Sequence, residues 1–176
     1  MNIKIRQEKE RDYKLSEKLV EKAFKNEDYS DHKEHLLVAK LRKSDIFIPE
    51  LSLLAEVDGE IVGHIMLTKL TIENERNKYN SLALAPVSVL PKYQNKGIAS
   101  KLITESLKIA KNMGFKSVIV LGHPNYYPRF GFKPASSWGI KPPFKVDDKA
   151  FMALELESKG LDASGGTVVY SKEFLE

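Results

Sequence analysis

Residues 84 to 101 read Leu-Ala-Pro-Val-Ser-Val-Leu-Pro-Lys-Tyr-Gln-Asn-Lys-Gly-Ile-Ala-Ser-Lys. This stretch predicts a short apolar strand, a turn that contains Gly97, and the start of a long amphipathic helix. The first N–H groups of a helix have no intrahelical partner and carry the positive end of the helix dipole. A glycine-bearing turn that enters a helix is therefore a typical binding place for a phosphate group.

The composition predicts one folded domain over residues 1–176. A charged fraction of 30% beside an apolar fraction of 42% is typical of a globular chain. The formal charge of +4 comes from lysines spread along the whole chain, a pattern that favours solubility over nucleic-acid binding. The absence of cysteine excludes disulfides, thiolate metal ligands and a cysteine nucleophile, and we expect no metal site. No apolar run approaches the roughly 20 residues of a membrane span, so we expect a cytoplasmic protein without membrane contact.

Hydrophobic periodicity predicts an alternation of strands and helices along the chain. The Asp58-Gly59-Glu60 sequence indicates a tight hairpin between two strands. A strand, a helix and another strand then follow one another as a βαβ unit. The predicted strands are 3–5, 51–57, 61–72, 81–90, 118–121, 151–156 and 167–170, and the predicted helices are 12–24, 36–41 and one after Gly97.

Pro86 interrupts the fourth predicted strand and removes one hydrogen-bond donor from it. A strand that is bulged or splayed there leaves the backbone groups of Val87, Ser88 and Val89 free for an extended amide-bearing ligand. The alternative is that Pro86 marks only a sheet edge. Because this strand runs directly into the predicted phosphate-binding turn, a ligand with a pyrophosphate and an extended amide arm would contact both features. Coenzyme A has that shape.

The segment Gln94-Asn95-Lys96-Gly97-Ile98-Ala99 resembles the acetyl-coenzyme A motif of the GNAT N-acetyltransferase superfamily. A second landmark, Tyr126-Tyr127-Pro128-Arg129-Phe130-Gly131-Phe132, is similar to that family's tyrosine before a Gly-Phe pair. The order of elements matches as well. The resemblance implies an α/β (α+β) fold of the compact bacterial type, with a mixed, mainly antiparallel twisted sheet of about six to seven strands, about four helices, and a splay at the fourth strand.

The resemblance also implies where acetyl-CoA would bind. The backbone of residues 95–100 would hold the pyrophosphate, Gln94 would shape the turn, and Gly97 would let the backbone approach the phosphate closely. The main chain of the fourth strand would contact the pantetheine arm. The predicted cofactor-binding residues are Val87, Ser88, Val89, Gln94, Asn95, Lys96, Gly97, Ile98, Ala99 and Ser100.

The implied reaction is direct transfer of an acetyl group to a primary amine in a ternary complex. Tyr127 stands at the family position of the general acid that protonates the departing thiolate. The fourth strand contains no carboxylate, so the general base is open among Glu56, His64 and His123. We place His123 first, because it follows the fifth strand, where ligands gather in open α/β sheets. A base acting through water, or no base, stays open.

We therefore expect an acetyl-CoA-dependent N-acetyltransferase that acts on a small molecule or a peptide, as a monomer or homodimer. The alternative is a CoA-binding regulator with weak or no catalysis. The segments expected to select the amine are the two early helices with their link, residues 72–80 and residues 136–148.

Overall fold

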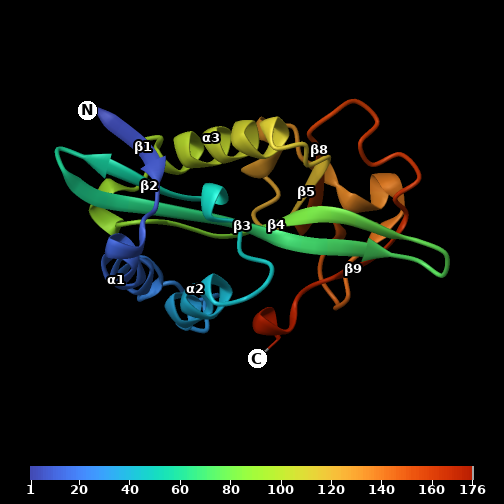
Figure 1. The fold of residues 1–176 in the computed structure, drawn as a ribbon, viewed down its shortest axis with the longest axis horizontal. Helices are drawn as coiled ribbons and strands as arrows, with labels where there is room; N and C mark the ends of the chain where they lie inside the picture. The colour runs from blue at the N-terminus through green and yellow to red at the C-terminus, as the bar shows by residue number, and fades with distance from the viewer. Residues whose placement is uncertain (176) are drawn as a thin grey trace. The chain divides into compact units, whose positions relative to one another are not determined.

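A computed structural model describes residues 1–175 and divides them into two compact units, each treated by itself below. Unit 1 contains residues 1–67 and 85–109, and unit 2 contains residues 68–84 and 110–175. The expectation of a single domain stays a prediction. The α-helices are α1 (Tyr13–Phe24), α2 (Glu34–Arg42) and α3 (Ile98–Asn112), and the strands are β1 (Ile3–Gln7), β2 (Ser52–Val57), β3 (Glu60–Glu73), β4 (Lys78–Val89), β5 (Ser117–Leu121), β6 (Lys133–Pro134), β7 (Ile140–Lys141), β8 (Phe151–Glu155) and β9 (Gly166–Val169) (Figure 1).

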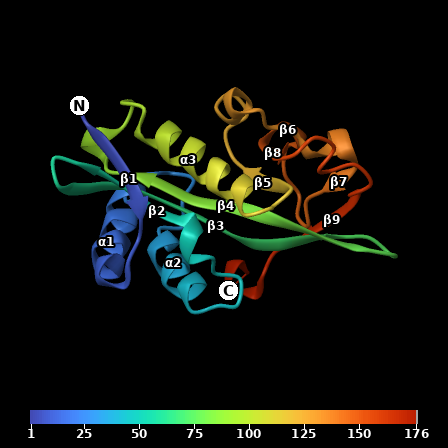
Figure 2. The same ribbon diagram turned by 45° about the horizontal axis from the view of Figure 1, so that its top comes forward.

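Unit 1 is built on an antiparallel meander of β1, β2 and the first half of β3. Asp58 and Gly59 join β2 to β3 with φ angles of +50° and +80°. Positive φ at both turn residues matches the twist of the flanking strands, so the predicted hairpin is confirmed. Helices α1 and α2 lie on one face of this meander, and the unit 1 part of α3 lies on the other (Figures 1 and 2).

Adjacent residues of β3 show how the two faces of unit 1 differ. A β-carbon on Gly63 would lie 3.0 Å from Leu102 and 3.2 Å from Ile98, both on α3. The next side chain, His64, points to the opposite face, where it lies near Glu8. One face of β3 is therefore apolar beneath α3, and the other carries a buried polar group.

Unit 2 combines the second halves of β3 and β4 with the C-terminal strands. β5 and β8 pair in antiparallel fashion, as do β3 and β9, whereas β4 and β5 pair in parallel with Ala83 opposite Ile119. The parallel pair confirms the predicted βαβ unit. The core of unit 2 includes Leu70, Ile72, Ala83, Ile119, Phe151 and Val168.

The mixed, mostly antiparallel α/β fold is confirmed, but within residues 1–175 the sheet has nine strands and not six to seven. The additional strands β6 and β7 have two residues each, too few to show an alternating pattern. Residues 1–175 contain three α-helices together with seven short 3-10 segments, so the expected fourth helix is wrong as an α-helix. β4 also begins at Lys78, three residues before the predicted start, because the Asn74–Asn77 turn is tight and its Asn74 N–H donates to the Asn77 carbonyl at 3.0 Å.

Candidate acetyl-CoA-binding and catalytic sites

The end of β4 is connected to α3 by a turn that its own hydrogen bonds hold in place, within unit 1. The Gln94 side-chain amide donates from Nε2 to the Val89 carbonyl at 3.1 Å. A 3-10 segment, Pro91–Tyr93, fills the turn, and the Tyr93 N–H donates to the Leu90 carbonyl at 2.8 Å. Gln94 therefore braces the strand against the loop, and its role toward acetyl-CoA stays a prediction.

Two residues with positive φ direct this loop into α3. Asn95 has φ +62° and Gly97 has φ +82°, after which the helix begins at Ile98. The Lys101 N–H donates to the Gly97 carbonyl at 3.1 Å, so the helical ladder starts at Gly97. The N–H groups of Ile98 and Ala99 precede the first residue that this ladder satisfies, at the positive end of the helix dipole. An anion at this turn would meet backbone donors.

The space beside Gly97 is open. A β-carbon built on this residue would have no protein atom within 4 Å apart from its chain neighbours. A side chain would therefore meet no obstacle in the protein and would project into the open space beside the turn. The open turn at Gly97, with the backbone donors at the start of α3, therefore fits a pyrophosphate group.

The predicted pantetheine-binding strand, Val87 to Val89, forms the unit 1 end of β4. The peptide bond between Ala85 and Pro86 is cis. Val87 is partly exposed, whereas Ser88 and Val89 are buried. The pairing of β4 with β5 is defined at Ala83, which precedes Pro86 and belongs to unit 2. The splay of β4 from β5 that we expect after Pro86 therefore stays a prediction.

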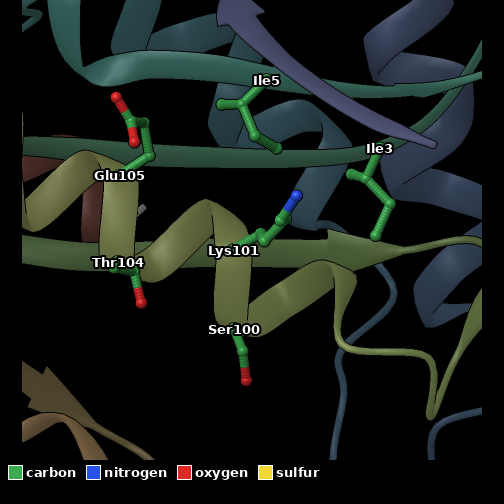
Figure 3. A pocket seen from close by; sticks show the side chains of 6 residues that line it. All are labelled: Ile3, Ile5, Ser100, Lys101, Thr104 and Glu105. Carbon is green, nitrogen blue, oxygen red and sulfur yellow. The ribbon is translucent and has the colours of Figure 1, made fainter.

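A cavity of about 500 Å³ lies between β1 and the first turns of α3 in unit 1 (Figure 3). It shares only Ser100 with the predicted cofactor-binding residues. Its lining residues are Ile3, Ile5, Ser100, Lys101, Thr104 and Glu105.

In unit 2, Tyr127 opens the 3-10 segment Tyr127–Phe130 and is 8% exposed. Its ring makes edge contacts with the rings of Tyr126 and Phe132, at centroid distances of 5.3 and 5.7 Å. Its N–H approaches the His123 carbonyl at 3.4 Å. The ring that the family resemblance marks as the general acid is therefore held by aromatic packing and by its own backbone.

Gly122 contributes to the placement of that ring in a way that the sequence analysis missed. A β-carbon on Gly122 would lie 2.3 Å from Tyr127 Cε2, closer than any real contact, and the Gly122 N–H donates to the Ala150 carbonyl at 2.9 Å. No local pattern signals this requirement, because it depends on how the loop folds back.

His123, the base placed first from the sequence, is exposed after β5. The Asn125 N–H donates to its Nδ1 at 3.4 Å. A neutral imidazole that accepts at Nδ1 carries its proton on Nε2. As a base, this ring would take a proton on the Nδ1 lone pair. That lone pair already accepts the hydrogen bond from the Asn125 N–H.

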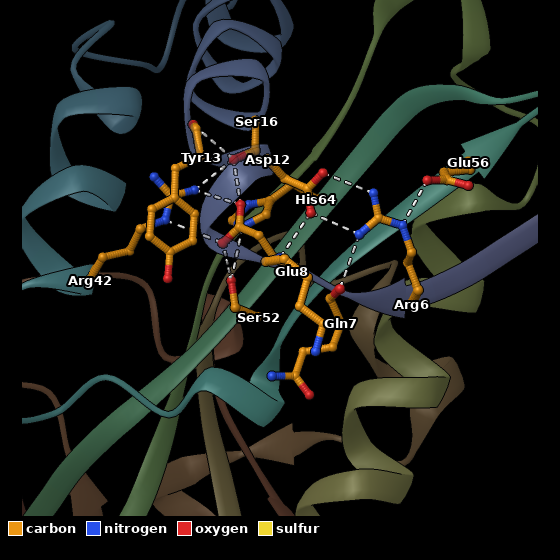
Figure 4. Close-up of polar contacts among 11 residues, drawn as sticks. Arg6, Gln7, Glu8, Asp12, Tyr13, Ser16, Arg42, Ser52, Glu56 and His64 are labelled. Atoms are coloured by element: carbon orange, nitrogen blue, oxygen red, sulfur yellow. Dashed lines mark hydrogen bonds and ion pairs between the residues drawn. The ribbon is translucent and has the colours of Figure 1, made fainter.

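The other two base candidates lie in unit 1 and have partners. Glu56 accepts from Arg6 Nε at 2.7 Å, and Arg6 also binds both oxygens of Asp12 at 2.8 and 2.9 Å (Figure 4). His64 has no exposed surface and belongs to a buried cluster with Glu8. Glu56 thus serves as an ion-pair partner of Arg6.

Within residues 1–175, no cluster of three or more His, Cys, Asp or Glu side chains could hold a metal ion, and no helix is long and apolar enough to cross a membrane.

Comparison with known proteins supports the family predicted from the sequence. A family model described as "Acetyltransferase (GNAT) domain" matches residues 4–135. The Escherichia coli K12 protein "Uncharacterized N-acetyltransferase YjhQ" is 40% identical over 118 residues, which are 66% of this chain and 65% of YjhQ. The match thus spans slightly less than two thirds of the length of that relative.

Two solved structures are similar over nearly the whole chain. The GNAT family N-acetyltransferase YhbS from Escherichia coli, in complex with CoA, has a TM-score of 0.87 and 26% identity, covering 100% of this chain and 93% of that one. A GNAT family acetyltransferase from Brucella melitensis, in complex with acetyl-CoA, has a TM-score of 0.81 and 34% identity, covering 98% of each chain. The family match covers most of the sequence, and the chain belongs to the GNAT acetyltransferase family.

Proposed function

We propose that this protein binds acetyl-CoA and transfers its acetyl group directly to a primary amine of a small molecule or peptide. The observation that carries the proposal is the open turn at Gly97, braced by Gln94 and followed by the start of α3. The similar structures from Escherichia coli and Brucella melitensis contain CoA and acetyl-CoA, respectively. These bound ligands support the same class of ligand for this protein.

Binding would use mainly backbone groups of unit 1. Residues 95–100 would donate N–H groups to the pyrophosphate, and Val87, Ser88 and Val89 would pair with the amides of the pantetheine arm as an added strand would. Lys96 is exposed in the same loop and would add positive charge near the phosphates.

The transfer replaces the C–S bond by a C–N bond, while the amine loses one proton and the sulfur gains one. The amine nitrogen bonds to the acetyl carbon while the C–S bond breaks, and the N–H of Val87 stabilises the negative charge that develops on the carbonyl oxygen. Tyr127 gives its hydroxyl proton to the departing sulfur. His123 remains a predicted base for the proton that the amine loses.

The test measures binding and turnover separately. Calorimetric titration with acetyl-CoA reports binding, and thiol release with benzylamine, tyramine, spermidine and Nα-acetyl-lysine reports transfer. We expect binding at physiological salt and amine-dependent thiol release above hydrolysis. Absence of binding would contradict the whole proposal.

A CoA-binding regulator is the second candidate, because residues 81–90 contain no carboxylate. Tight binding of acetyl-CoA without turnover on any amine of the panel would favour it. Mass spectrometry of the product distinguishes an acetylated amine from hydrolysed cofactor.

A further inference from the structure

A buried carboxylate lies beside His64 in unit 1 and plays no part in the transfer described above (Figure 4). Glu8 accepts hydrogen bonds from the Ser16 hydroxyl, from Ser52 Oγ at 2.8 Å, and from Arg42 Nε and Nη2 at 3.2 and 2.6 Å. Burial raises its pKa, but the bonds from His64, Arg42 and Ser16 outweigh burial and lower the pKa to about 2. At neutral pH Glu8 is therefore ionised and can only accept.

This carboxylate determines the tautomer of His64. Ser52 has one hydroxyl proton, which it donates to Glu8, so its oxygen is left to accept from His64 Nε2 at 3.3 Å. His64 Nε2 also lies 3.7 Å from Glu8 Oε2. The neutral ring consequently carries its proton on Nε2 and has its lone pair on Nδ1.

The Nδ1 lone pair has no partner within residues 1–175, although the ring is completely buried. A buried acceptor without a donor is costly and usually indicates a water or ligand group that completes it. The His64 ring is therefore oriented for proton acceptance at Nδ1.

A second unpartnered polar atom lies on the neighbouring strand. Ser88 is 3% exposed, and its Oγ has no hydrogen-bond partner among the described residues. The Leu90 N–H donates to the Val62 carbonyl at 2.9 Å. Continuing that antiparallel register places Ser88 opposite His64, and opposite residues share a face of the sheet. Ser88 also adjoins Val87, whose N–H is proposed to bind the acetyl oxygen.

We propose that His64 is the group that removes the proton from the attacking amine, and that the Ser88 hydroxyl passes this proton on. Neither Ser88 Oγ nor His64 Nδ1 has a hydrogen-bond partner among the described residues, so a water would bridge the two atoms. Ser88 passes its own proton through that water to His64 Nδ1 and takes one from the amine as the N–C bond forms. The separate proton on sulfur comes from Tyr127. After the products leave, His64 loses its proton to water and Tyr127 regains one. The inference rests on the proposed acetyl transfer.

The charged side chains near Glu8 and His64 come from several elements. Glu8 follows β1, Glu17 and Tyr13 lie on α1, and Arg42 lies on α2. Arg42 pairs with both Glu8 and Glu17 at 2.6 Å and stacks on the Tyr13 ring with 4.2 Å to its centroid. Among these groups, the two carboxylates exceed the one guanidinium by one negative charge.

The main test compares His64→Gln with wild type on the best amine of the panel. The glutamine amide can still donate to Ser52 but cannot accept a proton as imidazole does. We expect kcat to fall at least 30-fold at neutral pH and the acidic limb of the pH profile to disappear, while acetyl-CoA affinity stays within twofold. Ser88→Ala should lower kcat by about tenfold.

His35→Gln is the matched control. His35, on α2, also has an Nδ1 without a partner among the described residues, and its Nε2 lies 3.3 Å from a carboxylate oxygen of Glu21 on α1. Its pH profile of kcat should keep the acidic limb of wild type, whatever its effect on the affinity for the amine. A folded His64→Gln enzyme with wild-type kcat and pH profile overturns the assignment, as does a loss confined to His123→Gln.

A measurement on the wild-type protein does not depend on the folding of the His64→Gln variant. The chain has four histidines, so nitrogen NMR signals of His64 can be assigned by elimination with His32→Gln, His35→Gln and His123→Gln. We expect a protonated Nε2 and an unprotonated Nδ1, and the opposite tautomer overturns the proposal. Wild-type protein without turnover contradicts the acetyl transfer and the role of His64 together, whereas wild-type turnover with an unaffected His64→Gln contradicts only the latter.

Discussion

The ring of Tyr127 occupies the place that a side chain on Gly122 would need, since a β-carbon there would lie 2.3 Å from Cε2 and 2.9 Å from Cδ2. The Gly122 backbone is tied to Ala150 and cannot withdraw without losing that bond. The position of the proposed general acid thus depends on a missing side chain five residues earlier.

Gly122→Ala should push the Tyr127 ring aside and lower both stability and turnover. Overpacking of this kind costs roughly 1–3 kcal/mol. The measurement is a double-mutant cycle of unfolding free energies with Tyr127→Ala, which removes the obstructing ring. The alanine at position 122 should cost much less in the Tyr127→Ala background, and equal costs in both backgrounds would show that the ring is not the obstacle.

Tyr127→Phe should lower kcat by about 100-fold, the lower end of what a positioned general acid contributes. Acetyl-CoA affinity should change little, because the ring and its packing remain. The control is Tyr126→Phe, in the neighbouring ring 5.3 Å away, which should retain wild-type kcat. Steady-state thiol release with both substrates varied separates kcat from KM, and equal rates for the two variants would remove the acid role.

Gly97→Ala should weaken acetyl-CoA binding beyond its effect on stability. Gly59 offers a close control, since its φ is +80° against +82° at Gly97 and neither β-carbon would meet a protein atom within 4 Å. Each alanine should cost about 1–2 kcal/mol of stability for the left-handed conformation. Only Gly97→Ala should raise the calorimetric Kd, by tenfold or more, and a similar rise in Gly59→Ala would point to a general loss of structure.

Acid should destabilise the protein through Glu8. The folded-state pKa of about 2 lies below the ordinary value of 4.5, so Glu8 contributes its stability above pH 4.5 and loses it as the pH falls toward 2. The contribution at neutral pH is about 3 kcal/mol. Denaturant titrations of wild type and Glu8→Gln should therefore converge between pH 4.5 and 2.

Glu17→Gln provides the comparison for that series. Glu17 pairs with the same Arg42 but is 35% exposed, and a partly solvated ion pair contributes less. The unfolding free energy of Glu17→Gln should therefore show the same pH dependence as that of wild type. A Glu8→Gln protein that keeps the full loss of stability between pH 4.5 and 2 would locate the acid sensitivity elsewhere.

The regular elements were predictable because their signals are local. The stripe at three- and four-residue spacing predicted α1 and α3, and Asp58-Gly59 predicted the hairpin that the structure contains. The two-residue strands were not predictable, because Lys133–Pro134 and Ile140–Lys141 pair only through partners elsewhere in the chain. Their sequences are too short for any period.

The buried polar cluster shows the same limit at a functional level. Glu8 meets Arg42 across 34 residues and Ser52 across 44. From the sequence, Glu8 is one acid in a polar stretch, and His64 is one polar residue in a strand. Only the packing of α1 and α2 on β3 shows that Glu8 is ionised in the interior and that the ring of His64 has a defined tautomer.

The sequence by itself determined the segment from Leu84 to Lys101: a strand, a turn at Gly97 and a helix, together with the family that this segment indicates. Those features depend on neighbours within a few residues, because helix dipoles, turn angles and side-chain periodicity are local. The tertiary structure alone decided that Gly122 must lack a side chain and that Nδ1 of His64 has the free lone pair. Both depend on contacts between atoms that the chain brings together only when it folds.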